Sequence, residues 1–325
     1  MKTETSTRRD FLKSCSTALF AVAIPDSVLS LFPKTQKSLK LGMITDLHVD
    51  IIHDADIRFD AFLKEMKAER VDGLVQLGDF AIPKSENQHY IQSFNQAHSN
   101  AFHVLGNHDM DGGFSREEVV KMYGMPNNYY STEVNGVQLL ILDGNDTGSP
   151  TYKSGYHSYL GAEQLAWMKE ELIKAKKPVL IISHQPIAGI YTIDNAQEVQ
   201  DLLSTFSDKI LLAINGHAHV DQLVQVGGVN YLHLNSASDY WVGEKLAHQS
   251  LSVEIHDRFP SLQNTCPYSQ ALFGVLTIDP QQKTVSLKGK KAQWIGPSPL
   301  DLGYSIVSPE MQKLHVNPQI SDRNF

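Results

Sequence analysis

Residues 39–48 read LKLGMITDLH, a short apolar run over 39–44 that is followed by the side chains of Asp46 and His48. Four later apolar runs, at 73–77, 101–105, 179–182 and 210–214, are likewise followed by Asp, Asn or His side chains. Their length and their β-branched content predict buried strands. Helical periodicity lies between some of them, most clearly at 195–206 and 162–176. This alternation of strands and helices predicts a layered α/β fold.

Two dipeptides predict β-hairpins. Asn135-Gly136 separates the runs 130–134 and 137–142, and Gly227-Gly228 separates 222–226 and 229–234. A third hairpin is expected within 272–287, turning at Asp279-Pro280. We therefore expect two mixed sheets packed face to face, with helices outside. The Pro- and Ser-rich tail from Gly296 onward is expected to wrap the surface or to be loosely ordered.

The charge balance limits the class of partner. The chain has 36 acidic and 28 basic residues, a formal net charge of -8. A polymeric nucleic acid is not expected as a partner, because binding its backbone requires a basic face. A small phosphate ester is not excluded, since bound metal reverses the local charge at a site.

The ends of the five runs supply seven candidate metal ligands: Asp46, His48, Asp79, Asn107, His184, His217 and His219. Open α/β sheets place ligand sites at the carboxyl ends of their strands. Imidazole, carboxylate and amide oxygen bind Mn, Fe and Zn, and the absence of Cys from the set argues against a structural zinc site. Seven ligands exceed the need of one ion, so Asp79 is expected to bridge two divalent ions. Such a pair clamps an in-line displacement at phosphorus. His103 lies within a run and is excluded.

The motifs Asp46-x-His48, Gly78-Asp79, Gly106-Asn-His-Asp109, His184 and Gly216-His-x-His219 resemble the motif set of the calcineurin-like metallophosphoesterases. The resemblance covers roughly residues 39 to 240. It implies a four-layer α/β/β/α sandwich with a dinuclear centre. The first ion would be bound by Asp46, His48 and His219, and the second by Asn107, His184 and His217, with Asp79 shared.

The same resemblance implies that His108 is the general acid, oriented by Asp109. The expected activity is hydrolysis of phosphate mono- or diesters, with metal-bound hydroxide as the nucleophile. The sequence leaves open which ester is preferred, and which of Mn, Fe or Zn is bound. Phe80, not a tyrosine, follows the bridging Asp79, so a purple iron centre is not expected. The alternative is a non-catalytic, metal-dependent ligand-binding protein of the cell envelope on the same fold.

Tyr240 and Trp241 follow an apparent strand after the last motif. Two interpretations are open for this pair: packing in the core or at the rim of the site, and stacking on a substrate base.

The N-terminal residues predict export. Arg8-Arg9 precedes Phe11-Leu12-Lys13, an uncharged stretch runs over 14–25, and Ala21-Val-Ala23 is a candidate cleavage site. The arginine pair resembles a bacterial twin-arginine signal, so a periplasmic location is expected, with no stable membrane span after cleavage. The predicted organisation is an export signal and linker at 1–30, a metallophosphoesterase core at 38–243, and a C-terminal extension at 244–325 that completes or covers the sandwich.

Overall fold

The computed structural model describes residues 24–33, 36–304 and 316–325. The twin-arginine motif and the candidate cleavage site lie outside the described residues. The end of the predicted signal segment is described, and it contains the short helix α2 (Asp26–Ser30). No helix in the described ranges combines the length and the apolar character needed to cross a bilayer.

The first sheet has six strands in the order β16-β13-β12-β1-β2-β3. Its strands are β1 (Leu39–Ile44), β2 (Gly73–Gln76), β3 (Ala101–His103), β12 (Gly274–Asp279), β13 (Thr284–Lys288) and β16 (Arg323–Asn324). Strands β1, β2 and β3 run parallel, whereas β12 pairs antiparallel with β1 along its other side, with Met43 opposite Gly274. The region beyond residue 243 therefore supplies half of this sheet, including a direct neighbour of the first strand.

The second sheet has the order β4-β5-β6-β7-β9-β8. Its strands are β4 (Tyr130–Val134), β5 (Val137–Ile141), β6 (Val179–Ile182), β7 (Ile210–Asn215), β8 (Gln222–Val226) and β9 (Val229–His233). Strands β5, β6, β7 and β9 are parallel, and the two antiparallel edges are the hairpins β4–β5 and β8–β9. Both hairpin turns have two successive residues with positive φ, as the Asn-Gly and Gly-Gly dipeptides predict.

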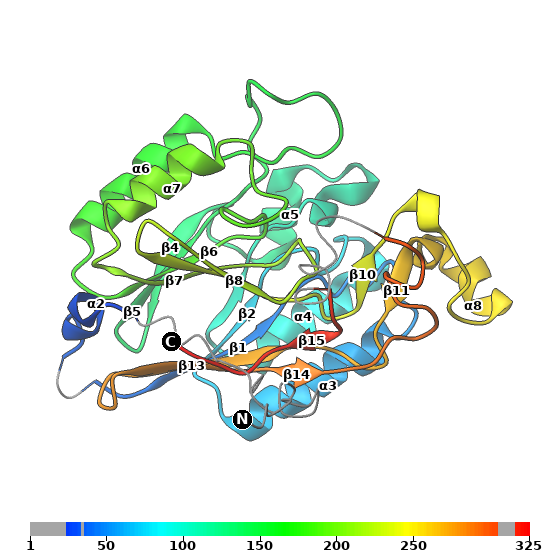
Figure 1. Cartoon of the computed structure of the whole chain (residues 1–325), viewed down its shortest axis with the longest axis horizontal. Coiled ribbons are helices and arrows are strands. Elements are labelled where there is room, and N and C mark those ends of the chain that lie inside the picture. Colours follow the sequence, from blue (N-terminus) through cyan, green and yellow to red (C-terminus); the bar gives the residue numbers. More distant parts are fainter. Residues whose placement is uncertain (1–23, 34–35, 305–315) are drawn as a thin grey trace, which may run out of the picture.

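Helices cover the outer faces of the two sheets (Figure 1). Helices α6 (Ala162–Lys174) and α7 (Ala196–Ser204) lie over the second sheet, and α3 (Ala55–Glu69) and α4 (Gln88–Ala97) lie on the side of the first. Strand β6 shows the layering, since Leu180 and Ile182 join the large core between the sheets, whereas Val179 and Ile181 join the core beneath α6 and α7. The prediction of an α/β fold with two mixed sheets and outer helices is confirmed.

The remaining elements connect or border these layers. Helix α5 (Arg116–Tyr123) contacts α4, and α8 (Val253–Arg258) lies in the C-terminal region. Two small sheets pair β10 (Asp239–Trp241) with β11 (Thr265–Pro267), and β14 (Lys290–Lys291) with β15 (Gln319–Ile320). Short 3-10 helices span Ser85–Asn87, His108–Gly113, Glu244–Leu246 and Pro260–Asn264. The end of the tail is thus paired to sheets, through β15 and β16.

Candidate metal centre

All seven predicted ligands follow the carboxyl ends of five parallel strands. Asp46 and His48 follow β1, Asp79 follows β2, and Asn107 follows β3 in the first sheet. In the second sheet, His184 follows β6, and His217 and His219 follow β7. Because the two sheets pack face to face, these ends meet at one edge of the sandwich. Six of the seven side chains are buried, and His217 is half-buried.

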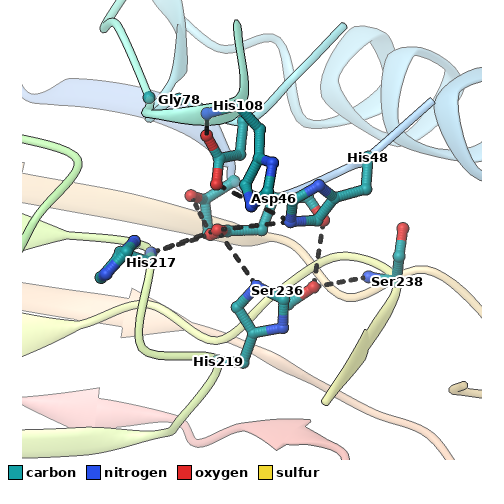
Figure 2. Close-up of polar contacts among 12 residues, drawn as sticks. Asp46, His48, Gly78, His108, His217, His219, Ser236 and Ser238 are labelled. Atoms are coloured by element: carbon teal, nitrogen blue, oxygen red, sulfur yellow. Dashed lines mark hydrogen bonds and ion pairs between the residues drawn. The ribbon is translucent and has the colours of Figure 1, made fainter. Parts of the chain in front are cut away.

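The side chains form two adjoining groups, each with three ligand atoms within 4.8 Å of one another. The first is Asp46, His48 and His219, and the second is Asp79, His184 and His217. In the first group His219 Nε2 lies 3.2 Å from Asp46 Oδ1, and in the second His184 Nε2 lies 3.1 Å from Asp79 Oδ2. Figure 2 shows the rings of His48 and His219 beside the carboxylate of Asp46.

Asp79 lies where the two groups meet. His48 Nε2, from the first group, is 3.8 Å from Asp79 Oδ2 and 3.9 Å from Asp46 Oδ1. Asn107 Oδ1 is buried and has no hydrogen-bond partner among the described residues. A buried amide oxygen without a partner is costly, so this atom fits the role of a metal ligand. The donor set is therefore suited to two divalent cations that share Asp79.

Hydrogen bonds fix the orientation of two of the imidazoles. His184 Nδ1 donates to the carbonyl oxygen of Leu77 at 2.8 Å, and His219 Nδ1 donates to the carbonyl oxygen of Asp239 at 2.8 Å. Because a carbonyl only accepts, the proton of each ring lies on Nδ1. The Nε2 lone pair then faces the carboxylates, which is the arrangement that neutral histidine ligands adopt in metal sites.

The backbone at these positions is unusual. Nine described residues other than glycine have positive φ, and five of them are Asp46, His48, Asp79, His217 and His219. This left-handed conformation is rare for side chains with a Cβ, and it clusters at functional sites, where the surrounding structure holds it in place. The strand ends are therefore built to aim side chains at the cavity.

The glycine before His217 has a different use from a tight turn. Gly216 is not among the residues with positive φ. A Cβ at Gly216 would lie 1.9 Å from Thr45 Oγ1 and 2.6 Å from Asp46 Oδ2. The glycine permits close approach of the two sheets at the site.

The charges in the cavity favour a bound cation. Burial opposes ionisation of Asp46, but His219 and His184 outweigh it and lower the pKa of the carboxyl to about 2. Burial likewise opposes a charge on His184, but Asp79 and Asp46 outweigh it and raise the pKa of the imidazole to about 9. Two ionised carboxylates thus draw a proton onto a ligand histidine. Metal ions compete with such protons for the same lone pairs.

His108 stands beside both groups and has its own hydrogen-bond partners. Its Nδ1 donates to Asp111 Oδ2 at 2.7 Å, and the Tyr156 hydroxyl lies 3.1 Å from the same nitrogen. That hydroxyl donates to Asp111 Oδ1 at 2.8 Å. Burial opposes protonation of His108, but Asp79 and the hydrogen bond with Asp111 outweigh it, so the pKa of the imidazole is raised.

The structure corrects the role expected for Asp109. Its buried carboxylate accepts hydrogen bonds from the backbone N–H groups of Gly106, Asp79 and Phe80, and from the Tyr123 hydroxyl. Burial, assisted by the charge of Asp79, raises its pKa to about 6. Asp109 therefore fixes the loops that carry the ligands, and Asp111 contacts His108 instead. The spacing His-x-x-Asp is the signal that sequence reasoning missed.

A second supporting segment follows β9. Ser236 Oγ donates to the carbonyl oxygen of Asp46 at 3.0 Å, and Ser238 Oγ donates to that of Leu47 at 2.7 Å. Figure 2 shows both serines beside the turn that presents Asp46 and His48. These contacts satisfy the carbonyl groups of a turn that leaves the β1 ladder.

The family assignment follows from the sequence match over these strands. The model of the calcineurin-like phosphoesterase family matches residues 39–221. The chain belongs to this family. It is therefore a hydrolase of phosphoester bonds, and its two groups of ligands are the candidate sites for divalent metals.

Similar proteins agree with this assignment. A probable cyclic nucleotide phosphodiesterase of Fibrobacter succinogenes is 25% identical over 214 residues, covering 59% of this chain and 77% of the relative. A dimetal phosphatase from Danio rerio has the same fold, with a TM-score of 0.56 at 17% identity, covering 79% of this phosphoesterase and 98% of that chain. The anchor in the inner membrane complex of Plasmodium also shares the fold, with a TM-score of 0.51 at 15% identity over 89% of this chain and 90% of that one.

Proposed function

We propose that this phosphoesterase hydrolyses small phosphate diesters at a dinuclear metal centre, with His108 as the general acid. The observation that carries the proposal is the meeting of two ligand groups at Asp79, with the His108 ring at their edge. The probable activity of the Fibrobacter relative supports a diester substrate. Phosphate monoesters are the second candidate, because the dimetal phosphatase from Danio rerio shares the fold.

The residues divide into holding and proton-transfer roles. Asp46, His48 and His219 would hold one ion, and Asn107, His184 and His217 the other, with Asp79 between them. Mn, Fe and Zn all suit this donor set. Bound divalent ions supply charge stabilisation at phosphorus and an activated water at neutral pH.

His108 supplies the proton that the departing alkoxide needs. A protonated imidazole is suited to this task, and the hydrogen bond from Nδ1 to Asp111 leaves Nε2 as the nitrogen that faces the substrate. Asp111 and Tyr156 act through His108 as positioning residues, since they hold the ring from the side opposite the leaving group.

The first experiment is a turnover assay with two esters. Purified protein loaded with Mn²⁺ is given bis(p-nitrophenyl) phosphate and p-nitrophenyl phosphate, with and without a chelator. We expect metal-dependent release of p-nitrophenol, faster from the diester. A faster rate on the monoester would make the protein a phosphatase. A fully metal-loaded, folded protein that hydrolyses neither would favour the non-catalytic ligand-binding alternative.

A variant of His108 tests the assignment of the acid. His108→Asn is expected to lose about 10²–10⁴-fold of turnover on an alkyl ester and much less on a p-nitrophenyl ester, which leaves without a proton. Metal content, measured on the same preparation, should be unchanged. Loss of metal in this variant would make His108 a ligand, and an equal loss on both esters would remove its role as an acid.

The export signal stays part of the proposal. The motif Arg8-Arg9 before Phe11-Leu12-Lys13 supports transport of the folded protein to the periplasm of a bacterial cell. Changing both arginines to lysine is expected to retain the protein in the cytoplasmic fraction of the source bacterium. Periplasmic recovery of that double variant would contradict it.

A further inference from the structure

A pocket of about 250 Å³ opens directly over the two ligand groups. Its floor is formed by ligand residues together with His108. Its wall is aromatic and consists of Tyr191, Tyr240, Trp241 and Tyr304. Among the described residues that line it there is no lysine or arginine. The wall therefore offers ring faces and phenol hydroxyls, not a second site for a phosphate group.

The four rings come from three separate parts of the chain. Tyr191 lies in the loop between β6 and α7, Tyr240 and Trp241 lie on β10, and Tyr304 lies in the C-terminal region. The hydroxyls of Tyr191 and Tyr304 are 3.2 Å apart, and the rings of Tyr240 and Tyr304 meet edge to face with centroids 5.4 Å apart. These contacts join the three segments into one surface.

Two of these aromatic side chains are exposed to solvent, and packing in the core does not explain their position. Trp241 is 39% exposed and Tyr191 is 46% exposed, although both belong to the wall of a cavity. Tyr191 also has a φ of 52°, a strained conformation for a bulky residue. Strain of this kind persists where a side chain must be aimed at a site.

The wall is fixed in position relative to the metal ligands. Asp239, the first residue of β10, accepts the hydrogen bond from His219 Nδ1 through its carbonyl oxygen, and its carboxylate lies 3.4 Å from the same nitrogen. Tyr240 and Trp241 follow directly. A single residue thus sets the distance between a ligand of the first group and the aromatic wall.

We propose that the wall binds a planar aromatic group of the substrate, of the nucleobase class, while its phosphate lies at the metal centre. The proposal rests on the proposed function. Aromatic side chains stack on nucleobases, and the phenol hydroxyls can pair with ring heteroatoms at the edge. An aromatic wall also suits a quaternary ammonium group. A cation beside two divalent ions is repelled, however, whereas a neutral base is not.

The test compares two probes that differ only in the base. Adenosine 5′-monophosphate and ribose 5-phosphate are titrated by calorimetry into the Mn²⁺-loaded protein, with phosphate release recorded in parallel. We expect the nucleotide to bind at least about tenfold more tightly, the contribution of one stacked base. Equal affinities for the two probes would overturn the proposal.

Variants of Trp241 separate stacking from simple apolar contact. Trp241→Leu keeps an apolar side chain without a ring. It should bring the affinity for adenosine 5′-monophosphate to within about twofold of that for ribose 5-phosphate, while the affinity for ribose 5-phosphate stays the same. Trp241→Phe restores a ring face and should retain most of the preference. Trp167→Leu, on α6 and outside the pocket lining, is the matched control and should retain all of it. Retention in Trp241→Leu would contradict stacking at this wall.

Two further outcomes distinguish the alternatives. If phosphocholine binds more tightly than the nucleotide, and Trp241→Leu removes that binding, the wall is a cation site and the proposal fails. If the nucleotide preference is present but no ester is hydrolysed, the aromatic site stands and the proposed function fails. If esters are hydrolysed without any preference between the two probes, the function stands and the aromatic site fails.

Discussion

The floor of the pocket is supplied by the ends of four strands, β1, β2, β3 and β7, whereas its wall is supplied by a loop, the short strand β10 and the C-terminal region. Backbone ladders on both sides hold β1, β2 and β7, and β3 is held by its ladder with β2. The wall is held by side-chain contacts such as the pair Tyr191–Tyr304, and by the short ladder between β10 and β11.

The difference teaches which part of the site is free to change. Moving a floor residue requires a change next to a strand of one of the two sheets, and four floor residues already have a strained backbone. In the wall, Tyr191 and Tyr304 lie in connections, where substitution is better tolerated, whereas Tyr240 is buried on β10. We infer that the floor sets the chemistry and the wall sets the choice of substrate.

The largest effect is expected from removing the Asp79 carboxylate, which lies between the two ligand groups of the floor. Asp79→Ala should lower turnover about a thousandfold, because the charge stabilisation that bound metal supplies is worth several kcal/mol. Metal analysis of the purified variant should show loss from both sites, since both groups face this carboxylate.

The matched control for Asp79 is Asp50→Asn. Asp50 belongs to the neighbouring loop, where it accepts hydrogen bonds from the Ile82 backbone and from Asn87, and it is in neither ligand group. This variant should keep both metals. A variant of Asp79 that retains one full equivalent of metal would show that the carboxylate serves a single ion.

The next largest effects separate two carboxylates that the sequence places side by side. Asp109→Asn should lower the free energy of unfolding by about 3 kcal/mol, because the amide nitrogen of Asn would replace one of two accepting oxygens and cannot accept from the backbone N–H donors that face it. Urea unfolding measures this. Asp111→Asn should leave unfolding nearly unchanged and lower turnover on an alkyl ester about tenfold. The opposite pattern would restore the role first expected for Asp109.

A smaller effect is expected from Tyr156, which contacts His108 and Asp111 from an exposed loop. Tyr156→Phe removes one hydrogen bond to Asp111 and should lower kcat on an alkyl ester by less than about fivefold. KM should be unchanged, because Tyr156 is not among the residues that line the pocket. A rise in KM at constant kcat would place Tyr156 in substrate binding.

The last prediction concerns stability and not turnover, and it involves a histidine in the first sheet, below the floor. Burial lowers the pKa of His103 to about 3, and the neutral ring accepts from Gln76 and donates to Asn95. The unfolded chain binds this proton near pH 6.5, so stability falls as the pH drops from about 6.5 towards 3. Between pH 7 and 4.5 the loss is about 3 kcal/mol.

His103→Gln tests this contribution by urea unfolding at both pH values. The variant should be less stable than the wild type at pH 7, but its free energy of unfolding should fall less between pH 7 and pH 4.5. His89→Gln, at a side chain that is 61% exposed, controls for removal of a surface histidine. An unchanged pH dependence in His103→Gln would show that the ring is protonated in the folded state.

The clustering of the seven candidate ligands was predictable because each of them closely follows an apolar strand, and local patterns reveal strand ends. Strands β1 and β6 match the predicted runs residue for residue. The partners of His108 were not predictable, since Tyr156 joins His108 only through the fold. The same holds for Tyr191 and Tyr304, which belong to loops without periodicity.

The order of the strands within each sheet could also not be predicted from the sequence pattern. A hairpin near the C-terminus was predicted from Asp279-Pro280, but nothing in its residues indicates that β12 pairs with β1. That register depends on apolar packing between the sheets, where Leu41 lies opposite Leu276. Pairing of this kind is decided by tertiary contacts, not by local propensity.

The pairing of β12 with β1 has a consequence for folding of the chain during its synthesis. Strand β1 is among the first elements made, and its antiparallel partner is among the last. Until residues 274–279 leave the ribosome, β1 has an open edge of unpaired backbone groups, the kind of edge that recruits foreign strands. The turn carrying Asp46 and His48 therefore follows a strand whose edge stays open until most of the polypeptide exists. A nascent chain released before that point would expose this edge to other chains.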